Sequence, residues 1–442
     1  MPANNRRWVA LSVLVTVAVI TFALHRYGLS TLAAHHQSIR DWLGGEGLYT
    51  SPGAVPPPAL AVLLTPLTLL PVPVAGWLLA LAGAVALTAV ALVVAGPVAR
   101  RYGRRRTPYV LGVAVLALLA EPVRATVGLG RPELLVLALI AADLVALRRA
   151  ARNRHRAPAR HTRIRRLPDG TVLSRLTTRR PRPGLEPSAP GPLRRAWTGG
   201  AWAGVGTGLA TALSATSLLF IAYLVITRQR RAAGLALVTT AVVGLGLLLT
   251  VPTETLSWYG HLMWEIDRPA PVSDPGNQSL AGVMARLYGY PAPPILVWFS
   301  FVMLLLAVGL IRARTAHADG DEVAAFTLIG LTAAVIVPVS TSAERLWLLP
   351  AVLILADSGL RRRRRVRLPR SARFAGAGCL LAATLTYLIA MVMPSWSLAW
   401  NIPALTMILL INILPSRHAT PPMPTGRRRP QRRAAIPMPR GG

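Results

Sequence analysis

The sequence predicts an all-α, polytopic membrane protein of about twelve transmembrane helices. The chain has 442 residues, of which 53% are hydrophobic. Its first apolar run, residues 8–24, is long enough to cross a bilayer. All 49 basic residues are arginines, and most of them stand in clusters between apolar runs. Long apolar runs separated by basic clusters are typical of a chain that crosses a membrane many times.

Further apolar runs are expected to span the membrane, at 74–96, 108–120, 133–147, 232–250, 295–311, 323–341, 346–360, 374–393 and 401–414. Residues 202–226 are polar in their middle, which predicts two short helices that meet at the outer face. Prolines interrupt the apolar run 56–74. Because proline lacks the N–H that a helix interior needs, the first part of this run is expected to form a short re-entrant or interfacial helix on the outer face.

The arginine clusters set the expected orientation of the chain. They stand at 100–106, 148–166, 228–231, 361–370 and 427–433. Placing all of them in the cytoplasm satisfies the positive-inside rule, so we expect a multi-pass plasma-membrane protein with both termini cytoplasmic. The net charge of +33 is then explained by topology and by attraction to anionic membrane lipids, and nucleic acid is not expected as a partner. The single cysteine, Cys379, lies in an apolar run, and neither a metal nor a cofactor is expected.

This orientation divides the chain into four regions. Residues 1–147 form an N-terminal transmembrane region with a first outer loop, and 148–196 form a cytoplasmic segment rich in arginine and proline, without apolar periodicity. A C-terminal transmembrane region follows at 197–414 and includes a large outer loop at 251–294. Residues 415–442 are expected to be a disordered cytoplasmic tail.

Five stretches between Leu43 and Pro350 resemble the integral-membrane mannosyltransferases of glycosyltransferase family 87. They are "GLYTSPGAVPPPALAVLLTPLTLLP", "EPVRATVGLGRPELLVLALIAADL", "GLATALSATSLLFIAYLVITRQRRAA", "GNQSL" and "VPVSTSAERLWLLP". The resemblance rests on their order and spacing. It implies a GT-C architecture, a polyprenyl-phosphate-mannose donor, and transfer of an α-linked mannose to a lipid-linked or cell-envelope glycan on the outer face.

Such an enzyme needs two kinds of group. A carboxylate must accept the proton of the acceptor hydroxyl, and cations or amides must hold the phosphate as negative charge develops. By the resemblance, Arg124 supplies the cation, with Glu121 orienting it. The polar stretch of the large outer loop, Asn277, Gln278 and Ser279, would hold sugar hydroxyls.

The chain also departs from the family pattern at several polar positions. The family's first-loop Asp falls near Leu32, its Lys on Ser214 and its Pro on Ser217; its Gln and Asn become Arg131 and Glu133, and its paired His become Ala343 and Glu344. The apolar scaffold persists while these groups are lost. This pattern indicates a diverged or catalytically silent member, so whether the chain is an enzyme stays open.

The missing first-loop carboxylate needs a replacement if the chain is active. That loop contains two acids, Asp41 and Glu46. Asp41 is expected on a short helix that Gly44 and Gly45 end, whereas Glu46 falls in the glycine turn. Since a rigid element positions a catalytic group better than a loop does, Asp41 is the predicted general base. The alternative is a solvated surface carboxylate, in which case attention shifts to Glu344.

Structural roles are alternatives for the other candidates. Glu121 and Arg124 could only be an ion pair that fixes two short helices. Asn277 to Ser279 could form a turn before an amphipathic helix whose apolar side chains face lipid, namely Leu280, Met284 and Leu287. Three aromatic side chains of the same loop fit an interfacial belt as well as a sugar platform: Trp258, Tyr259 and Trp264.

Two other functions remain as alternatives. A catalytically silent relative would bind polyprenyl lipid or scaffold an active homologue. A transporter would be expected to show an internal repeat and charged residues at mid-membrane. The sequence shows no clear repeat, and Asp143 and Asp357 fall near the cytoplasmic ends of their spans.

Overall fold

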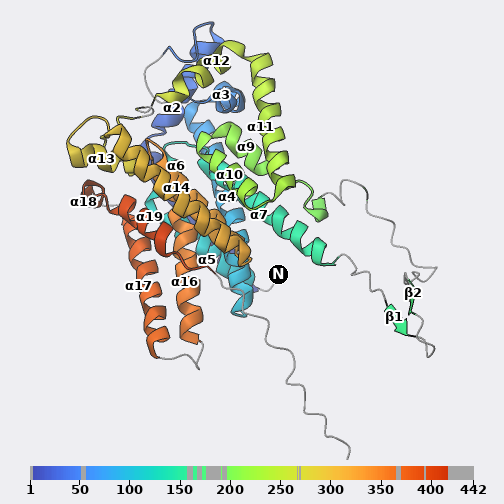
Figure 1. The fold of residues 1–442 in the computed structure, drawn as a ribbon. Coiled ribbons are helices and arrows are strands. Elements are labelled where there is room, and N and C mark those ends of the chain that lie inside the picture. Colours follow the sequence, from blue (N-terminus) through green and yellow to red (C-terminus); the bar gives the residue numbers. More distant parts are fainter. Residues whose placement is uncertain are drawn as a thin grey trace, which may run out of the picture.

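The computed structural model describes residues 3–50, 56–156, 163–166, 172–175, 191, 197–265, 267, 270–364, 370–392 and 395–416. Within these residues the regular structure is helical except for one antiparallel pair of short strands, β1 (Arg163–Arg166) and β2 (Val172–Arg175) (Figure 1). The pair lies in the segment 148–196, for which no regular structure was expected. Most of the predicted tail, residues 417–442, lies outside the described residues.

Five helices of the described chain are long and apolar enough to cross a membrane. They are α1 (Ala3–Tyr27), α4 (Val72–Arg101), α11 (Arg230–Thr250), α14 (Ile295–Ala318) and α17 (Arg370–Val392). Each matches a predicted span. A sixth crossing results if α5 (Arg106–Leu119) and α6 (Glu121–Gly128), which are bent by 72° at their junction, count as one span. The count of about twelve is not reached by length and composition, and it stays a prediction.

The segment that follows α1, predicted to be the first outer loop, contains the short helix expected around Asp41, and this helix begins earlier than expected. Helix α2 (Ser30–Leu43) follows α1 and ends at Gly44. A short helix, α3 (Pro58–Leu64), and the 3₁₀ turn η1 (Thr65–Leu69) occupy the proline-interrupted run before α4. Proline at the first position of α3 has no N–H to leave unpaired, which is why the helix starts there.

One expected loop is a helix. Residues 121–132 fall between the predicted spans 108–120 and 133–147, but 121–128 form α6, with Pro122 in its first turn. Helix α7 (Glu133–Arg156) then extends beyond the predicted end of its span at 147. Between residues 202 and 226 the predicted break is confirmed: α9 (Val205–Leu213) ends at Ser214, whose backbone is extended, before the 3₁₀ turn η2 (Ala215–Ser217) and α10 (Leu218–Ile226).

The rest of the described chain builds residues 251–294, predicted to be the large outer loop, and the C-terminal helices. The outer loop contains α12 (Pro252–Gly260), η3 (Leu262–Trp264) and α13 (Leu280–Tyr288). In Figure 1, α16 and α17 run side by side as a hairpin. The remaining elements are α15 (Glu322–Ile336), η4 (Glu344–Trp347), α16 (Leu348–Arg364), α18 (Ser395–Ala399) and α19 (Ile402–Ile413).

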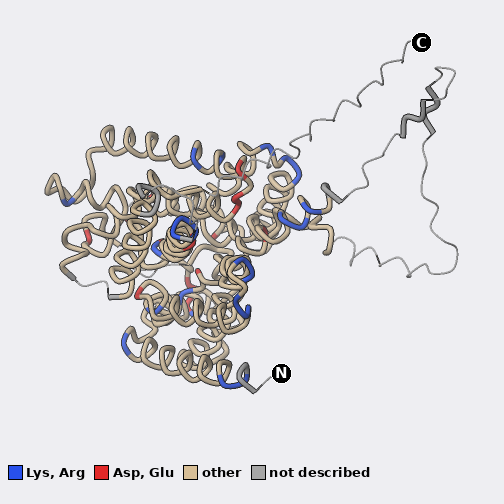
Figure 2. Tube along the Cα trace, turned by 90° about the horizontal axis from the view of Figure 1, so that it is seen from below, with Lys and Arg blue, Asp and Glu red and all other residues tan. Residues whose placement is uncertain are grey.

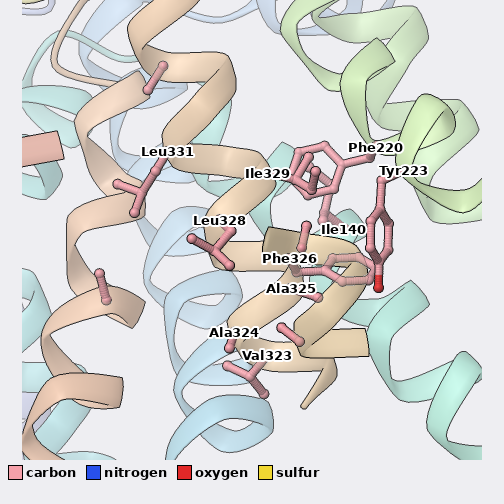
Figure 3. Packing of buried hydrophobic residues seen from close by; sticks show 14 of the residues in the cluster. Ile140, Phe220, Tyr223, Val323, Ala324, Ala325, Phe326, Leu328, Ile329 and Leu331 are labelled. Atoms are coloured by element: carbon pink, nitrogen blue, oxygen red, sulfur yellow. The ribbon is translucent and has the colours of Figure 1, made fainter. Parts of the chain in front are cut away.

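Helix α15 is the centre of the main hydrophobic core. Its residues from Val323 to Val335 are all buried, as expected for a helix that is apolar on every side. On one side the ring of Phe326 meets Phe220 and Tyr223 of α10, with centroid distances of 5.6 and 5.4 Å (Figure 3). This packing fixes the position of α10, and with it the helix break that precedes α10.

Two buried carboxylates join helices near one end of the molecule. Asp357 of α16 accepts hydrogen bonds from Arg101 (3.0 Å) and Tyr102 (3.1 Å), which stand at the end of α4. Asp143 of α7 accepts from the backbone N–H groups of Gly206 and Thr207 at the start of α9. Both acids therefore fasten helices together. Figure 2 shows the arginines mostly toward helix ends, separated by long uncharged stretches.

Candidate functional site

A cavity of about 300 Å³ lies where six separate parts of the chain meet. Its walls come from α2, the start of α3, the α6–α7 junction, the break between α9 and η2, the region of α12 and η3, and the loop 337–344. Its polar lining consists of Thr31, His35, Arg131, Glu133, Ser214, Thr216, Glu265, Thr341 and Glu344. A narrower cavity of about 40 Å³ shares part of this lining and reaches Phe220 and Trp347.

Arg131 and Glu344 are joined through one hydroxyl group on the cavity wall. Arg131 Nη1 donates to Thr341 Oγ1 at 2.7 Å, and Thr341 Oγ1 donates to Glu344 Oε2 at 2.7 Å. The backbone N–H of Thr341 also donates to Glu344 Oε2, at 2.7 Å. Two hydrogen bonds thus hold one carboxylate oxygen of Glu344, and the structure records no bond from a described residue to the other. The carboxylate is fixed in orientation and keeps one oxygen for a ligand.

His35 and Glu133 complete the ionisable lining. Burial, and secondarily the charge of Arg131, lowers the pKa of His35 to about 4, so this imidazole is neutral at pH 7. Its Nδ1 is buried without a hydrogen-bond partner among the described residues, and so is Oε2 of Glu133. Arg131 is the one arginine in the described lining of the larger cavity. The unpaired Nδ1 of His35 and Oε2 of Glu133 belong to the same lining.

The docking of α2 on the end of α6 places Arg131 beside Thr31. The backbone N–H groups of Leu29 and Leu32 donate to the carbonyls of Gly128 (2.9 Å) and Leu129 (3.0 Å). Gly130 has a φ of +72°, and a Cβ there would come within 2.6 Å of Leu32 Cβ. A larger residue at 130 would therefore push α2 away and open the wall of the cavity.

The helix break opposite Arg131 supplies hydroxyl groups. Ser214 Oγ and Thr216 Oγ1 lie 2.8 Å apart, and both residues line the two cavities. Trp347 forms part of the lining of the narrower cavity, and its indole packs on α15 at Gly330, where any Cβ would overlap the ring. The lining of the narrower cavity thus combines the hydroxyl groups of Ser214 and Thr216 with the aromatic ring of Trp347.

Asp41, the predicted general base, lies apart from this cavity. Helix α2 presents Thr31 and His35 to the cavity, whereas Asp41 is not part of its lining. Asp41 stands six positions after His35, which at about 100° per residue turns Asp41 roughly 120° away from that face. Its carboxylate instead accepts a hydrogen bond from Gln37 Nε2 at 2.6 Å on the exposed surface. This geometry favours the solvated-surface alternative.

The expected pairing of Glu121 with Arg124 is wrong. Arg124 Nη2 donates to the carbonyl of Met391 on α17 at 2.7 Å, and the structure records no ion pair between these two described residues. Glu121 Oε2 instead lies 3.6 Å from Arg345 Nη2. Neither residue lines the cavity. The reason is the helical form of α6, which turns Arg124 toward α17 and Glu121 toward η4.

Asn277, Gln278 and Ser279 are buried and bonded to the protein itself, a geometry that favours the structural alternative over the predicted role as sugar ligands. Asn277 Nδ2 donates to the carbonyls of Val272 and Pro338, and its Oδ1 accepts from the N–H groups of Ser279 and Ser340. All four bonds are 2.9–3.1 Å long. The Asn277 amide thus supplies hydrogen-bond partners to backbone groups of two segments, residues 272–279 and the segment that follows α15.

The neighbouring side chains are equally occupied. Gln278 Nε2 donates to the carbonyls of Pro275 and Leu398, at 2.8 and 3.1 Å. Ser279 Oγ donates to Pro338 O and accepts from Gly282 N, so it caps the first turn of α13. These polar residues therefore hold the outer loop in place and do not line the cavity.

Two arginines complete this junction. Arg286 donates to the carbonyls of Asp274 (2.5 Å) and Asn277 (2.8 Å), and Arg345 donates to that of Gly276 (3.0 Å). Buried carbonyl groups that lack strand or helix partners need such donors. Polar residues therefore interrupt the apolar chain at this junction because backbone groups there need side-chain hydrogen-bond partners.

The amphipathic helix α13 also differs from its expected placement. Leu280 and Met284 belong to the main buried core, while Leu287 is 77% exposed. The three side chains were expected to face lipid together, but only Leu287 is free to do so. The aromatic side chains of the loop also differ in their placement: Trp258 lines the cavity, whereas Trp264 is 70% exposed.

The residues that sequence reasoning missed as site residues are His35, Arg131, Glu133 and Thr341. A signal for two of them, Arg131 and Glu133, was present in the sequence. Ser214, Arg131, Glu133 and Glu344 are departures from the family pattern, and all four line the larger cavity; Ser217 and Ala343 line the narrower one. The departures are far apart in sequence but gather in space. Among the described residues, no group of three His, Cys, Asp or Glu side chains is arranged to hold a metal ion.

Comparison with known proteins gives consistent matches. A family model described as glycosyltransferase family 87 matches residues 55–168 and 188–341, which is more than half of the chain. A polyprenol-phosphate-mannose-dependent alpha-(1-2)-phosphatidylinositol mannoside mannosyltransferase of Mycobacterium tuberculosis (strain ATCC 25618 / H37Rv) is 30% identical over 172 residues, 39% of each chain.

A second relative from that species gives a longer match. The polyprenol-phosphate-mannose-dependent alpha-(1-2)-phosphatidylinositol pentamannoside mannosyltransferase of strain CDC 1551 / Oshkosh is 28% identical over 210 residues, 45% of this chain and 46% of the relative. These alignments span less than half the length of the curated relatives. No solved structure matches the chain.

Proposed function

Because this chain belongs to glycosyltransferase family 87, we propose that it transfers mannose from polyprenyl-phosphate-mannose to a lipid-linked or cell-envelope glycan. The names of its relatives support the donor and point to a phosphatidylinositol mannoside as the class of acceptor. Transfer takes place on the outer face of the plasma membrane, in a GT-C arrangement of about twelve spans with both termini cytoplasmic. The arginine clusters support this orientation and contacts with anionic lipids.

The observation that carries the proposal is the meeting of Arg131 and Glu344 on one cavity wall. In the reaction, a bond forms between the acceptor oxygen and C1 of mannose while the bond from C1 to the phosphate oxygen breaks. The acceptor proton passes to the free oxygen of Glu344, and polyprenyl phosphate leaves. Arg131 stabilises the negative charge that grows on the phosphate.

The neighbouring groups suit these roles. Neutral His35 adds no second charge beside Arg131. The hydroxyls of Ser214 and Thr216 face the same cavity and can bond to sugar hydroxyls. Glu344 therefore takes the role first assigned to Asp41, and Arg131 that of Arg124.

A catalytically silent relative is the second candidate, because one observation favours it. The family's Lys and one of its paired His are replaced here by Ser214 and Ala343, and both positions line the narrower cavity. Such a protein would bind the polyprenyl lipid without transferring its sugar. Transport is not supported, since Asp143 and Asp357 are bonded to neighbouring helices.

Two measurements on the full-length protein separate these functions. Membranes that overexpress it are given polyprenyl-phosphate-[¹⁴C]mannose, and both donor binding and mannose transfer to lipid are measured. We expect both above the level of membranes without the protein. Binding without transfer identifies the silent relative, and the absence of both contradicts the proposal.

A further inference from the structure

A second hollow, of about 540 Å³, lies between the first outer loop and α12. Its lining includes Trp42, Glu46 and Tyr49 from the first outer loop, and Thr253, Glu254 and Ser257 from α12. Glu46, Thr253 and Ser257 are exposed. We name this hollow the outer groove.

Aromatic side chains and the carboxylate of Glu254 hold the outer groove together. Trp42 Nε1 donates to Glu254 Oε1 at 2.8 Å, and Thr253 Oγ1 donates to Glu254 Oε2 at 2.7 Å. The ring of Tyr49 packs on that of Trp258, with centroids 5.9 Å apart. The Tyr49 hydroxyl is buried, and none of the described residues offers it a hydrogen bond. A polar atom of this kind is costly unless a water or a ligand satisfies it.

The outer groove adjoins the cavity that contains Arg131 and Glu344. Trp258, which contacts Tyr49, is itself part of the lining of that cavity. Tyr49 and Trp258 thus form a shared wall.

The chemistry of the outer groove selects a neutral polyol. Carboxylates accept hydrogen bonds from vicinal sugar hydroxyls, hydroxyl side chains both donate and accept them, and an indole face packs against the C–H groups of a pyranose ring. The described lining holds two glutamates and no arginine. It therefore repels the phosphate of the donor or of an anionic lipid.

We propose that the outer groove is the subsite for the saccharide part of the acceptor glycan. Glu46 and Ser257 bind hydroxyl groups of that saccharide, and the Trp42 and Tyr49 side chains form its apolar wall. This inference rests on the proposed function, because it assigns the acceptor of that reaction. It separates the two substrates: the charged donor phosphate lies at Arg131, and the neutral sugar lies in the outer groove.

The test measures saccharide binding without catalysis. The purified full-length protein is titrated with a soluble mannose disaccharide by calorimetry, and the variants are Glu46→Gln and Ser257→Trp. Loss of a hydrogen bond to a charged group should weaken binding about tenfold in Glu46→Gln. Ser257→Trp fills the groove from an exposed helix position and should abolish binding. Asp267→Asn, which neutralises another exposed acid of the outer face, is the matched control and should bind normally.

Donor binding separates this inference from the proposed function. All three variants should bind polyprenyl-phosphate-mannose like the wild type, and their thermal midpoints report folding. The inference is overturned if the wild type binds no disaccharide, if Glu46→Gln and Ser257→Trp bind it normally, or if the control loses it equally. Failure of the wild type to transfer mannose would instead refute the proposed function and leave the binding result valid.

Discussion

Arg131 and Glu344 bond to the same hydroxyl, that of Thr341, although 213 positions separate them in the chain. A cation and a carboxylate held in this way are close without neutralising each other directly. One can bind a phosphate while the other accepts a proton. The proposed transfer of mannose depends on that arrangement.

Arg131→Ala should weaken binding of polyprenyl-phosphate-mannose. The loss of charge-assisted hydrogen bonds to phosphate corresponds to a factor of about ten to one hundred in Kd. Arg124→Ala is the matched control, because Arg124 bonds to Met391 O outside the cavity. The control should lower the yield of folded protein but not the affinity per folded molecule. Donor titration of both variants decides, and an affinity loss confined to Arg124→Ala would contradict the site.

Asn277→Ala should destabilise the protein without changing donor affinity. The change leaves the N–H groups of Ser279 and Ser340 and the carbonyl of Val272 unpaired, at about 1–3 kcal/mol for each group that water does not reach, while Pro338 O keeps its bond from Ser279 Oγ. The thermal midpoint of the purified protein should fall by several degrees, whereas Asp267→Asn should leave it unchanged. A normal midpoint with lost donor binding would restore Asn277 as a sugar ligand.

His35 should make the protein less stable in acid. Its folded-state pKa of about 4 lies below the unfolded value of 6.5, so the unfolded state binds the proton more readily between these values. This contribution to stability is intact above pH 6.5 and is lost as the pH falls toward 4, by about 2 kcal/mol at pH 5. His35→Phe should reduce the drop in thermal midpoint between pH 7 and pH 5. An equal drop in the variant would show that His35 is not the group responsible.

Cysteine labelling tests the orientation in the membrane. With Cys379 replaced by serine, Asp267→Cys should react with an impermeant maleimide in intact cells, and Arg152→Cys should react only after lysis. Both positions are exposed on the protein. Reaction of Arg152→Cys in intact cells would place the arginine clusters outside and invert the topology.

Local patterns predicted much of the helical framework. Hydropathy located α1, α4, α11, α14 and α17, because lipid requires long apolar helices. The polar residues around Ser214 predicted the break before α10. Helix α6 was not predicted, because its short sequence lacks the long apolar run by which the spans were located. Pro122 after Glu121 is nevertheless a signal for the start of a helix.

The site was harder to predict than the fold. Asp41 was predicted as the base from its position in the first loop. Which side of α2 lines the cavity depends on how α2 packs against the end of α6, and the sequence does not show that packing. Asn277 and Gln278 looked like ligands because the sequence does not show that nearby carbonyls need donors. Arg131 and Glu344 come from distant segments, and only the folded chain brings them to one hydroxyl.

The most direct test of the central claim compares two isosteric variants in one mannose-transfer assay. Glu344→Gln removes the carboxylate that the structure places in the cavity, and Asp41→Asn removes the one on the outer face of α2. We predict that Glu344→Gln lowers transfer about a hundredfold or more, as expected for loss of a general base, with donor binding intact. We predict the wild-type rate for Asp41→Asn. Wild-type transfer in Glu344→Gln, or loss in Asp41→Asn alone, would contradict the account.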